Sequence, residues 1–174
     1  MDLVITGDAP GVALGWASLE AKRYRCALGR AGIKAMKREG DGATPIGAFP
    51  LRRLYYRPDR GDPPKTHLPM TALSPEDGWC DAPEDTRYNR LVRLPYPASH
   101  EKMWRDDAIY DLVLVIGHND DPPQAGMGSA IFLHLARNDY APTEGCVAFS
   151  RPDFEAILAR LGTDGRVQIM APGN

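Results

Sequence analysis

The sequence has few cysteines, no long hydrophobic run and no excess of basic residues. Its three cysteines, Cys26, Cys80 and Cys146, are far apart and form no Cys-x-x-Cys pair, which excludes a zinc ribbon and a thioredoxin-type motif. No segment approaches the roughly 20 apolar residues of a membrane-spanning helix. Lys and Arg number 21 against 23 Asp and Glu, so the formal net charge is -2. We therefore expect neither nucleic acid nor a membrane among the partners.

A secretory signal is also missing from the first residues, MDLVITGD, which carry neither a basic segment nor a long apolar stretch. We expect a cytoplasmic location, with a periplasmic location as the alternative if a leader has been removed. The odd number of cysteines leaves at least one thiol free, and a Cys26–Cys80 disulfide would be unusual in a reducing compartment. The sequence indicates no oligomeric state.

Length and composition predict one globular domain over residues 1–174, since 43% of the residues are hydrophobic and 25% are charged. Short runs of β-branched, aromatic and aliphatic residues predict strands at 3–6, 12–18, 24–28 and 47–56. They are cut by glycine and proline, which favours an antiparallel meander or a barrel-like sheet. Eight of the 16 prolines fall within residues 57–100. We interpret this segment as long folded loops inserted over the site, without a core of their own.

Regular structure is predicted again from residue 109. The runs at 109–117, 129–135 and 166–170 are typical of strands. A helix is expected at 152–161, with Ser150 as its N-cap and Gly162 at its end. The predicted fold class is mainly β (α+β): a sandwich or barrel-like sheet with one or two short helices and long Pro-rich loops.

A histidine and a cysteine stand on either side of a short polar loop, in LHLARNDYAPTEGCVAFS, residues 133–150. Gly145 permits a tight turn that presents Cys146 at the rim of the core. The 12 positions from His134 to Cys146 allow both side chains to reach the same edge of the sheet. An imidazole can take the proton of a thiol, and the amides of the turn can stabilise an oxyanion. This pattern favours acyl transfer from an amide or ester.

Several other interpretations fit the same residues. Cys146 can pack as a small hydrophobic residue, and His134 can be a hydrogen-bonded core residue. A metal site would draw on His100, His118, His134 and Cys146, but no two of them have closely paired spacing. The adjacent pairs Asp106-Asp107 and Asp120-Asp121 are more typical of solvated loops than of a matched acid and base. We predict no metal and no cofactor.

Two spaced motifs resemble the L,D-transpeptidase (YkuD-type) catalytic domain family. His134 followed by TEGCVAF is similar to the family's His and Ser/Thr-His-Gly-Cys block. TPIGAF, residues 44–49, is similar to its Thr-Pro-x-Gly-x-Phe element, and GSAIFLH, 128–134, to the strand that leads to the histidine. DGWCD, 77–81, with YNR, 88–90, resembles a small bacterial branch. The resemblance covers nearly the whole chain.

The resemblance implies a peptidoglycan stem peptide as the substrate. In this family the cysteine attacks the carbonyl of the third residue, typically meso-diaminopimelate, and expels D-Ala; the acyl group then passes to an amine or to water. Carried onto this sequence, Cys146 resembles the nucleophile and His134 the general base. The Gly145 and Cys146 amides would stabilise the oxyanion, and the Leu135 carbonyl would orient the imidazole.

The sequence departs from the family pattern near the cysteine. Glu144 replaces the usual histidine, Ala148 stands where many members have an arginine, and the loop between histidine and cysteine is short. The substrate carboxylate must then bind elsewhere, and Lys37, Arg137 and Arg151 are the candidates. The substrate-binding residues that we predict are Lys37, Thr44, Asn119, Ser129 and Arg137.

The activity predicted from these features is L,D-carboxypeptidase: removal of the terminal D-Ala from recycled tetrapeptides, with water as the acceptor. Cross-linking requires a location outside the cytoplasm, which a chain without a leader does not reach. The alternative is L,D-transpeptidation, with an amine as the acceptor. A hypothesis of another class is a peptidoglycan-peptide-binding module without catalytic activity, in which Cys146 is unreactive.

Overall fold

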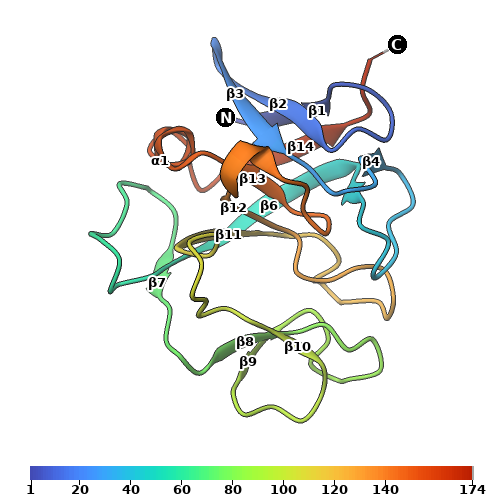
Figure 1. The fold of residues 1–174 in the computed structure, drawn as a ribbon, viewed down its shortest axis with the longest axis vertical. Helices are drawn as coiled ribbons and strands as arrows, with labels where there is room; N and C mark the ends of the chain where they lie inside the picture. Colours follow the sequence, from blue (N-terminus) through green and yellow to red (C-terminus); the bar gives the residue numbers. More distant parts are fainter. Residues whose placement is uncertain (174) are drawn as a thin grey trace.

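Nine strands form the main sheet of the computed structural model, which describes residues 1–173. They are β1 (Leu3–Gly7), β2 (Leu14–Leu19), β3 (Lys22–Ala27), β6 (Gly47–Tyr56), β7 (Met70–Ala72), β11 (Leu112–Ile116), β12 (Phe132–Leu135), β13 (Val147–Phe149) and β14 (Arg166–Met170). Their order is β11-β12-β13-β3-β2-β1-β14-β6-β7, and β11 also pairs with β6. All of them except β7 therefore form a closed ring, drawn in Figure 1. This is the mainly β, barrel-like sheet that the sequence predicts.

The sheet is mixed, not antiparallel as expected. β1 pairs in parallel with β14, β12 with β13, and β6 with β7. Only β1, β2 and β3 follow one another as antiparallel neighbours through short turns. The later strands return through longer connections, and a long connection allows a strand to enter beside its neighbour in the same direction. The pairing of β12 with β13 is the most important of these for the site. β12 carries His134, and the loop that ends in Cys146 leads from β12 into β13.

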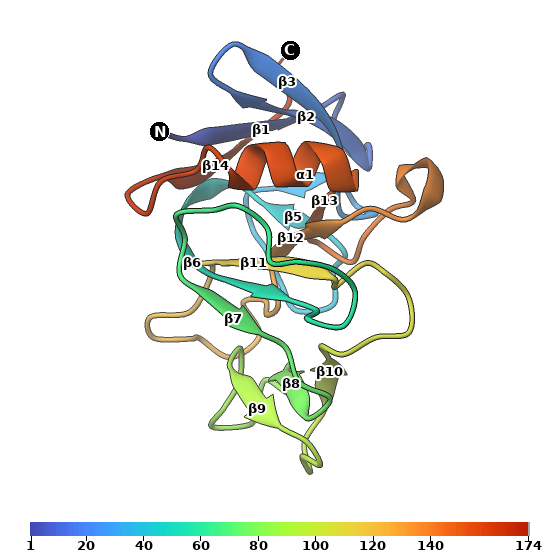
Figure 2. The same ribbon diagram turned by 90° about the vertical axis from the view of Figure 1, so that its left-hand side faces the viewer.

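Apolar side chains fill the barrel and attach its helix. Leu3 and Ile5 of β1 alternate with less buried residues, whereas all five residues of β11 are buried. α1 (Arg151–Leu158) begins after Ser150, whose hydroxyl accepts a hydrogen bond from the Asp153 amide at 3.3 Å. Phe154, Ile157 and Leu158 bury one face of the helix against the barrel core, and Figure 2 shows the helix in front of the strands. The helix ends three residues before the predicted end at Leu161.

Residues 57–100 contain more regular structure than predicted. β8 (Asp77–Cys80) pairs with β9 (Leu91–Arg93) and with β10 (His100–Lys102) in a three-stranded sheet. Cys80, Ala82 and Val92 form a small apolar cluster there, whereas the sequence predicts no core for this segment. In Figure 1 this sheet lies at the end of the molecule farthest from the two termini.

Three shorter elements complete the described fold. β4 (Ile33–Lys34) pairs with β5 (Thr44–Pro45), and a 3-10 helix, η1 (Asn138–Tyr140), lies in the loop between β12 and β13. Cys26, Cys80 and Cys146 are all buried free thiols. None of the helices within residues 1–173 is both long and apolar enough to cross a bilayer. Within the same residues, no group of three or more His, Cys, Asp or Glu side chains is placed to hold a metal ion.

Candidate active site

The parallel pairing of β12 with β13 brings the predicted histidine and cysteine to one cavity. Leu133 is in register with Val147, and His134 with Ala148. His134 therefore lies within β12, while Cys146 lies one residue before β13 begins. Both side chains line a cavity of about 350 Å³. We call it the catalytic cavity.

A closed turn holds Cys146 at the cavity wall. The Thr143 hydroxyl donates to the Cys146 carbonyl at 2.7 Å and accepts the Gly145 amide at 3.1 Å. Gly145 has φ +139, and a Cβ there would lie 2.8 Å from the Ala43 carbonyl oxygen, so the position requires glycine. The Thr143 amide also bonds to the Leu28 carbonyl at 2.9 Å, which ties the turn to the end of β3.

The Cys146 sulfur is buried and hydrogen-bonded to the backbone. Sγ donates to the Ala130 carbonyl at 3.1 Å and accepts the Phe132 amide at 3.4 Å. Only 8% of the residue is exposed. Burial, with a smaller contribution from the negative charge of Glu101, raises the pKa of the Cys146 thiol to about 12. The sulfur is thus protonated at neutral pH, and a role as nucleophile would require the loss of that proton.

The imidazole of His134 is held in one neutral tautomer. Its Nδ1 lies 2.8 Å from the Leu135 carbonyl oxygen, the contact that the family resemblance implied. A carbonyl oxygen only accepts hydrogen bonds, so Nδ1 carries the ring proton and Nε2 keeps its lone pair. The Tyr110 ring meets the imidazole edge-on, with centroids 5.2 Å apart. Burial lowers the pKa of His134 to about 4, so the imidazole is neutral at pH 7.

No hydrogen bond joins His134 to Cys146 among residues 1–173, because the thiol is directed at Ala130. Proton transfer therefore needs a rotation of the cysteine side chain. Catalytic hydrogen bonds are often long or poorly aligned without substrate and tighten in the substrate complex. Both side chains line the same cavity, so a rotated Cys146 side chain would remain within it.

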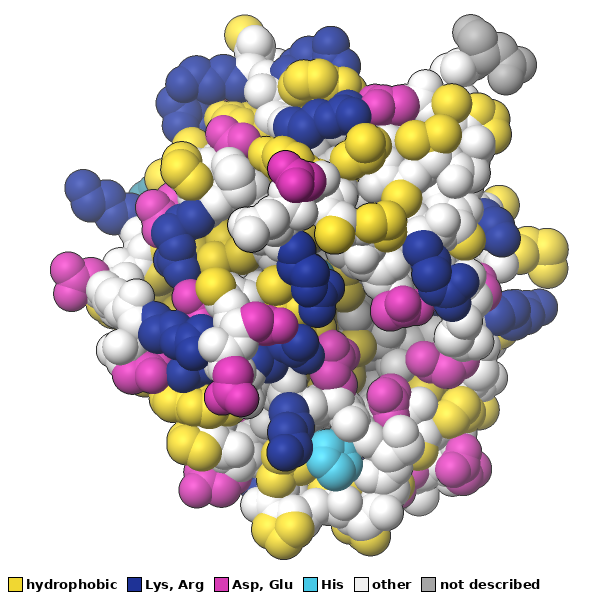
Figure 3. All heavy atoms as spheres, viewed as in Figure 1, with side chains coloured by type: hydrophobic (Ala, Val, Ile, Leu, Met, Phe, Trp, Pro, Cys, Tyr) yellow, Lys and Arg dark blue, Asp and Glu magenta, His cyan; other side chains and the backbone are white. Residues whose placement is uncertain are grey.

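The cavity wall carries charges of both signs. Its basic residues are Lys37, Arg105 and Arg137, and its acidic residues are Glu39, Asp81, Glu101 and Glu144. Figure 3 shows side chains of both charges interspersed around the middle of the face drawn in Figure 1. Two buried side-chain atoms on the wall, Asp81 Oδ1 and Ser129 Oγ, have no hydrogen-bond partner within the described chain. Buried polar atoms usually have partners, so these two are suited to bind a ligand.

The structure brings together some of the predicted substrate-binding residues. Lys37, Ser129 and Arg137 line the catalytic cavity together with Cys146 and His134. Lys37 is 6% exposed, and its ammonium group bonds to Asp41 at 2.5 Å. The side chain of Arg137 is 48% exposed and lies 3.8 Å from Asp107, so it can turn to a substrate carboxylate at little cost.

Other predicted residues do not line this cavity. Thr44 is fully buried, and its hydroxyl accepts the Gly29 amide at 2.8 Å. The Asn119 amide group donates to the Gln124 and Gly128 carbonyls, which holds a loop in place. Arg151 lies on α1 and pairs with Asp111 at 2.8 Å. The Gly145 amide donates to Thr143, so in this structure its proton is directed into the turn rather than toward an oxyanion.

Sequence reasoning missed several residues of the wall, among them Tyr110, Glu101 and Arg105. The Tyr110 hydroxyl donates a short hydrogen bond to Glu101, and the ring packs on His134. Burial raises the pKa of Glu101. Arg105 lies close to the Tyr110 ring, with its guanidinium carbon 5.4 Å from the ring centroid. Tyr110 carried one available signal: a phenol among the aliphatic residues of the run at 109–117. Glu101 and Arg105 carried none, because they follow the Pro-rich segment without periodicity.

A closed, sheet-rich barrel that presents a thiol and an imidazole on one cavity defines a catalytic domain with a mainly β fold. The family model described as the L,D-transpeptidase catalytic domain (YkuD) matches residues 16–169 of this chain. That match spans most of the 174 residues, and the chain belongs to this family of peptidoglycan enzymes. Comparisons with curated proteins and with solved structures found no match.

Proposed function

We propose that this protein is an L,D-carboxypeptidase that removes the terminal D-Ala from peptidoglycan tetrapeptides through a Cys146 thioester. The observation that carries the proposal is the shared cavity of Cys146 and His134, with Nε2 of the imidazole free to accept a proton. Family membership supports a peptidoglycan peptide as the substrate. The charges of both signs on the wall suit a stem peptide whose third residue has both an ammonium and a carboxylate group, such as diaminopimelate.

The proposed reaction has two halves. Cys146 Sγ leaves the Ala130 carbonyl, passes its proton to His134 Nε2 and attacks the carbonyl carbon of the third residue. The tetrahedral intermediate collapses, the C–N bond breaks, and D-Ala leaves with the proton from His134. Water then attacks the thioester with His134 again as the base, which releases the tripeptide and restores the thiol.

Water is the proposed acceptor because the cavity is small. Its volume of about 350 Å³ is near the lower end of ligand pockets, which run from roughly 300 to 1,000 Å³. Once the acyl group of one stem peptide occupies it, little volume is left for a second peptide, whereas water needs almost none. A cytoplasmic location belongs to this proposal, and the three free thiols are the form that a reducing compartment maintains.

The test is to incubate the protein with a diaminopimelate tetrapeptide, with and without an added D-amino acid, and to weigh the products. Tripeptide alone supports hydrolysis, whereas an exchanged tetrapeptide indicates transpeptidation and overturns the choice of water. Cys146→Ala should abolish either product. Cys26→Ala, which removes a buried thiol of the barrel core that does not line the cavity, is the matched control and should retain activity.

A peptide-binding module without catalytic activity is the second candidate. The observation that favours it is the raised pKa of the Cys146 thiol, about 12, in the free protein. This candidate predicts that wild type and Cys146→Ala bind the tetrapeptide equally and that neither forms product. Product from the wild type alone would exclude it.

A further inference from the structure

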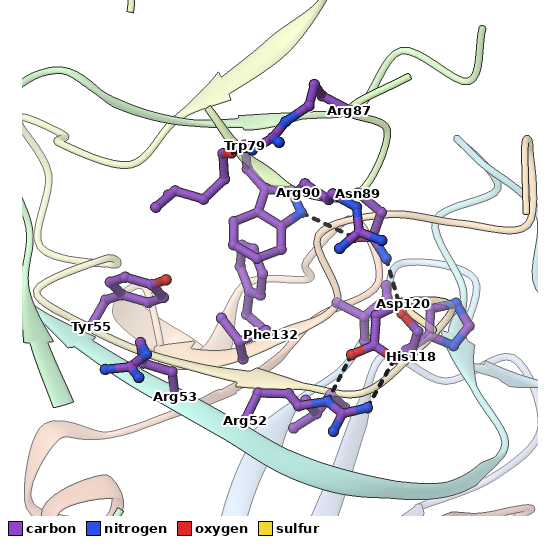
Figure 4. Close-up of a pocket in the computed structure, with 14 residues that line it drawn as sticks. Arg52, Arg53, Tyr55, Trp79, Arg87, Asn89, Arg90, His118, Asp120 and Phe132 are labelled. Atoms are coloured by element: carbon purple, nitrogen blue, oxygen red, sulfur yellow. Dashed lines mark hydrogen bonds and ion pairs between the residues drawn. The ribbon is translucent and has the colours of Figure 1, made fainter. Parts of the chain in front are cut away.

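A second cavity, larger than the catalytic one, opens between the barrel and the small sheet. Its volume is about 490 Å³. Its lining includes four arginines, Arg52, Arg53, Arg87 and Arg90, and the aromatic rings of Trp79 and Phe132, all labelled in Figure 4. Only Ile131 also lines the catalytic cavity. We call this second cavity the arginine cleft.

The floor of the arginine cleft is apolar and fixed. Trp79 and Phe132 meet edge to face, with centroids 5.0 Å apart. The Trp79 indole N–H donates to Asn89 Oδ1 at 3.0 Å, so the ring cannot turn without losing a buried hydrogen bond. Tyr55 stands beside them, and Val115 and Ile116 come from β11. A floor of this kind accepts a planar or apolar group.

The rim of the arginine cleft is cationic. Arg52 and Arg53 come from β6, and Arg87 and Arg90 come from the loop before β9, so the four side chains surround Trp79 from two sides (Figure 4). Asp120 is the one carboxylate on the lining, against these four arginines. The chain as a whole has a formal net charge of -2, so this local excess of positive charge is not a general property of the surface.

Three of these guanidinium groups have no carboxylate within ion-pair distance in the described chain. Arg52 is paired with Asp120 at 2.8 and 3.2 Å. Arg53 instead donates to the Thr71 hydroxyl at 2.8 Å, and Arg87 to the Leu91 carbonyl at 3.0 Å, both neutral acceptors. Within residues 1–173, no ion pair involves Arg53, Arg87 or Arg90. Several arginines held around an apolar floor without carboxylate partners are suited to a ligand that bears more than one negative charge.

We propose that the arginine cleft is a second ligand site, which binds a nucleoside diphosphate or a closely similar diphosphate ester. The diphosphate would accept hydrogen bonds from Arg53, Arg87 and Arg90, whose planar forks match phosphate oxygens. The base would lie over the aromatic floor beside Trp79. The volume of about 490 Å³ is within the range of small-ligand pockets. This site does not depend on the chemistry proposed for Cys146.

Calorimetric titration at low ionic strength tests the proposal with UDP, ADP, pyrophosphate, uridine and citrate as the probes. We expect both nucleoside diphosphates to bind, pyrophosphate to bind more weakly because it lacks a base, and uridine to bind at least about tenfold more weakly because it lacks the anion. Cys146→Ala should bind the diphosphates as wild type does. Equal binding of uridine and UDP would overturn the proposal, as would citrate binding as tightly as UDP, which would indicate a general anion surface.

A pair of variants locates the binding. The double substitution Arg53→Gln with Arg90→Gln should weaken UDP binding by at least about tenfold. Both side chains are exposed, so the fold should persist, and circular dichroism checks this. The matched control is Arg23→Gln, an exposed position on β3, which is separated from β6 by three strands. Unchanged UDP affinity in the double variant, or the same loss in the control, would rule out the cleft as the site.

Discussion

The carbonyl oxygen of Ala130 accepts the thiol hydrogen bond of Cys146 at 3.1 Å. This contact holds the proton on sulfur and turns it away from the imidazole of His134. It also makes the position of residue 130 part of the site, although its side chain is only a methyl group. The reactivity of the cysteine therefore depends on how firmly the segment 129–132 is held.

The first prediction concerns alkylation of Cys146 in the free protein. With a thiol pKa of about 12, the rate with iodoacetamide should keep rising with pH beyond 9, since the thiolate is the reactive form. Peptide mass spectrometry at each pH measures labelling at this residue, with Cys146→Ala as the blank. A plateau near pH 7 would instead show a preformed thiolate–imidazolium pair.

The second prediction concerns stability in acid. The folded pKa of His134 is lowered to about 4, so between pH 6.5 and 4 the unfolded chain binds a proton that the folded chain does not. The free energy of unfolding should therefore fall as the pH falls through this window, by up to about 3 kcal/mol from this residue. Urea denaturation at pH 7 and pH 4 measures the loss. His134→Gln, which does not titrate, should show a smaller difference; an equal difference would assign the loss to other groups.

The third prediction concerns Thr143, whose hydroxyl closes the cysteine turn. Thr143→Val keeps the shape but removes the bonds to the Cys146 carbonyl and the Gly145 amide. We expect a loss of about 1–3 kcal/mol in the free energy of unfolding and a fall in kcat of at least about tenfold. Denaturant titration and steady-state kinetics measure the two effects. Thr143→Ser, which retains the hydroxyl, should recover most of both, and failure to do so would point to the methyl group instead.

The fourth prediction concerns Asn89, which joins the small sheet to Ala130, the residue whose carbonyl binds the Cys146 thiol. Its Oδ1 accepts the Trp79 indole and the Ala130 amide, and its Nδ2 donates to the His118 and Asn119 carbonyls. Asn89→Ala should lower the free energy of unfolding by about 2–4 kcal/mol, because several buried groups lose partners.

A second substitution at the same residue separates its two roles. Asn89→Asp keeps the acceptor for Trp79 and Ala130 but loses both donors. It should be destabilised and still retain more activity than Asn89→Ala. If the two variants lost the same activity at a temperature where both are folded, the contact with Ala130 would have no part in positioning Cys146.

Local patterns in the sequence predicted much of the barrel. The bounds of β6 and β14 match the apolar runs at 47–56 and 166–170, and Ser150 caps the helix as expected. These features depend on neighbours in the chain. The parallel pairing of β1 with β14 joins residues more than 160 positions apart, and no local pattern encodes which distant strand lies beside which.

The candidate site also has residues that local sequence patterns predict and residues that only the tertiary fold brings there. His134 and Cys146 could be found because a histidine at a strand end and a cysteine after a glycine turn are local features. Tyr110 and Glu101 belong to the same cavity only because the chain folds back over β12. The sequence did not predict the protonation state of Cys146 either. Its thiol pKa of about 12 results mainly from burial, and its hydrogen bond goes to the Ala130 backbone carbonyl.

One residue, Ile131, lines both the catalytic cavity and the arginine cleft. On one side of it the Ala130 carbonyl binds the Cys146 thiol, and on the other the Phe132 ring meets Trp79 edge to face. If a ligand in either cavity shifts this short segment, binding at the two sites is thermodynamically linked through it. Any factor by which an anion in the cleft changes the affinity for substrate is also the factor by which substrate changes the affinity for the anion.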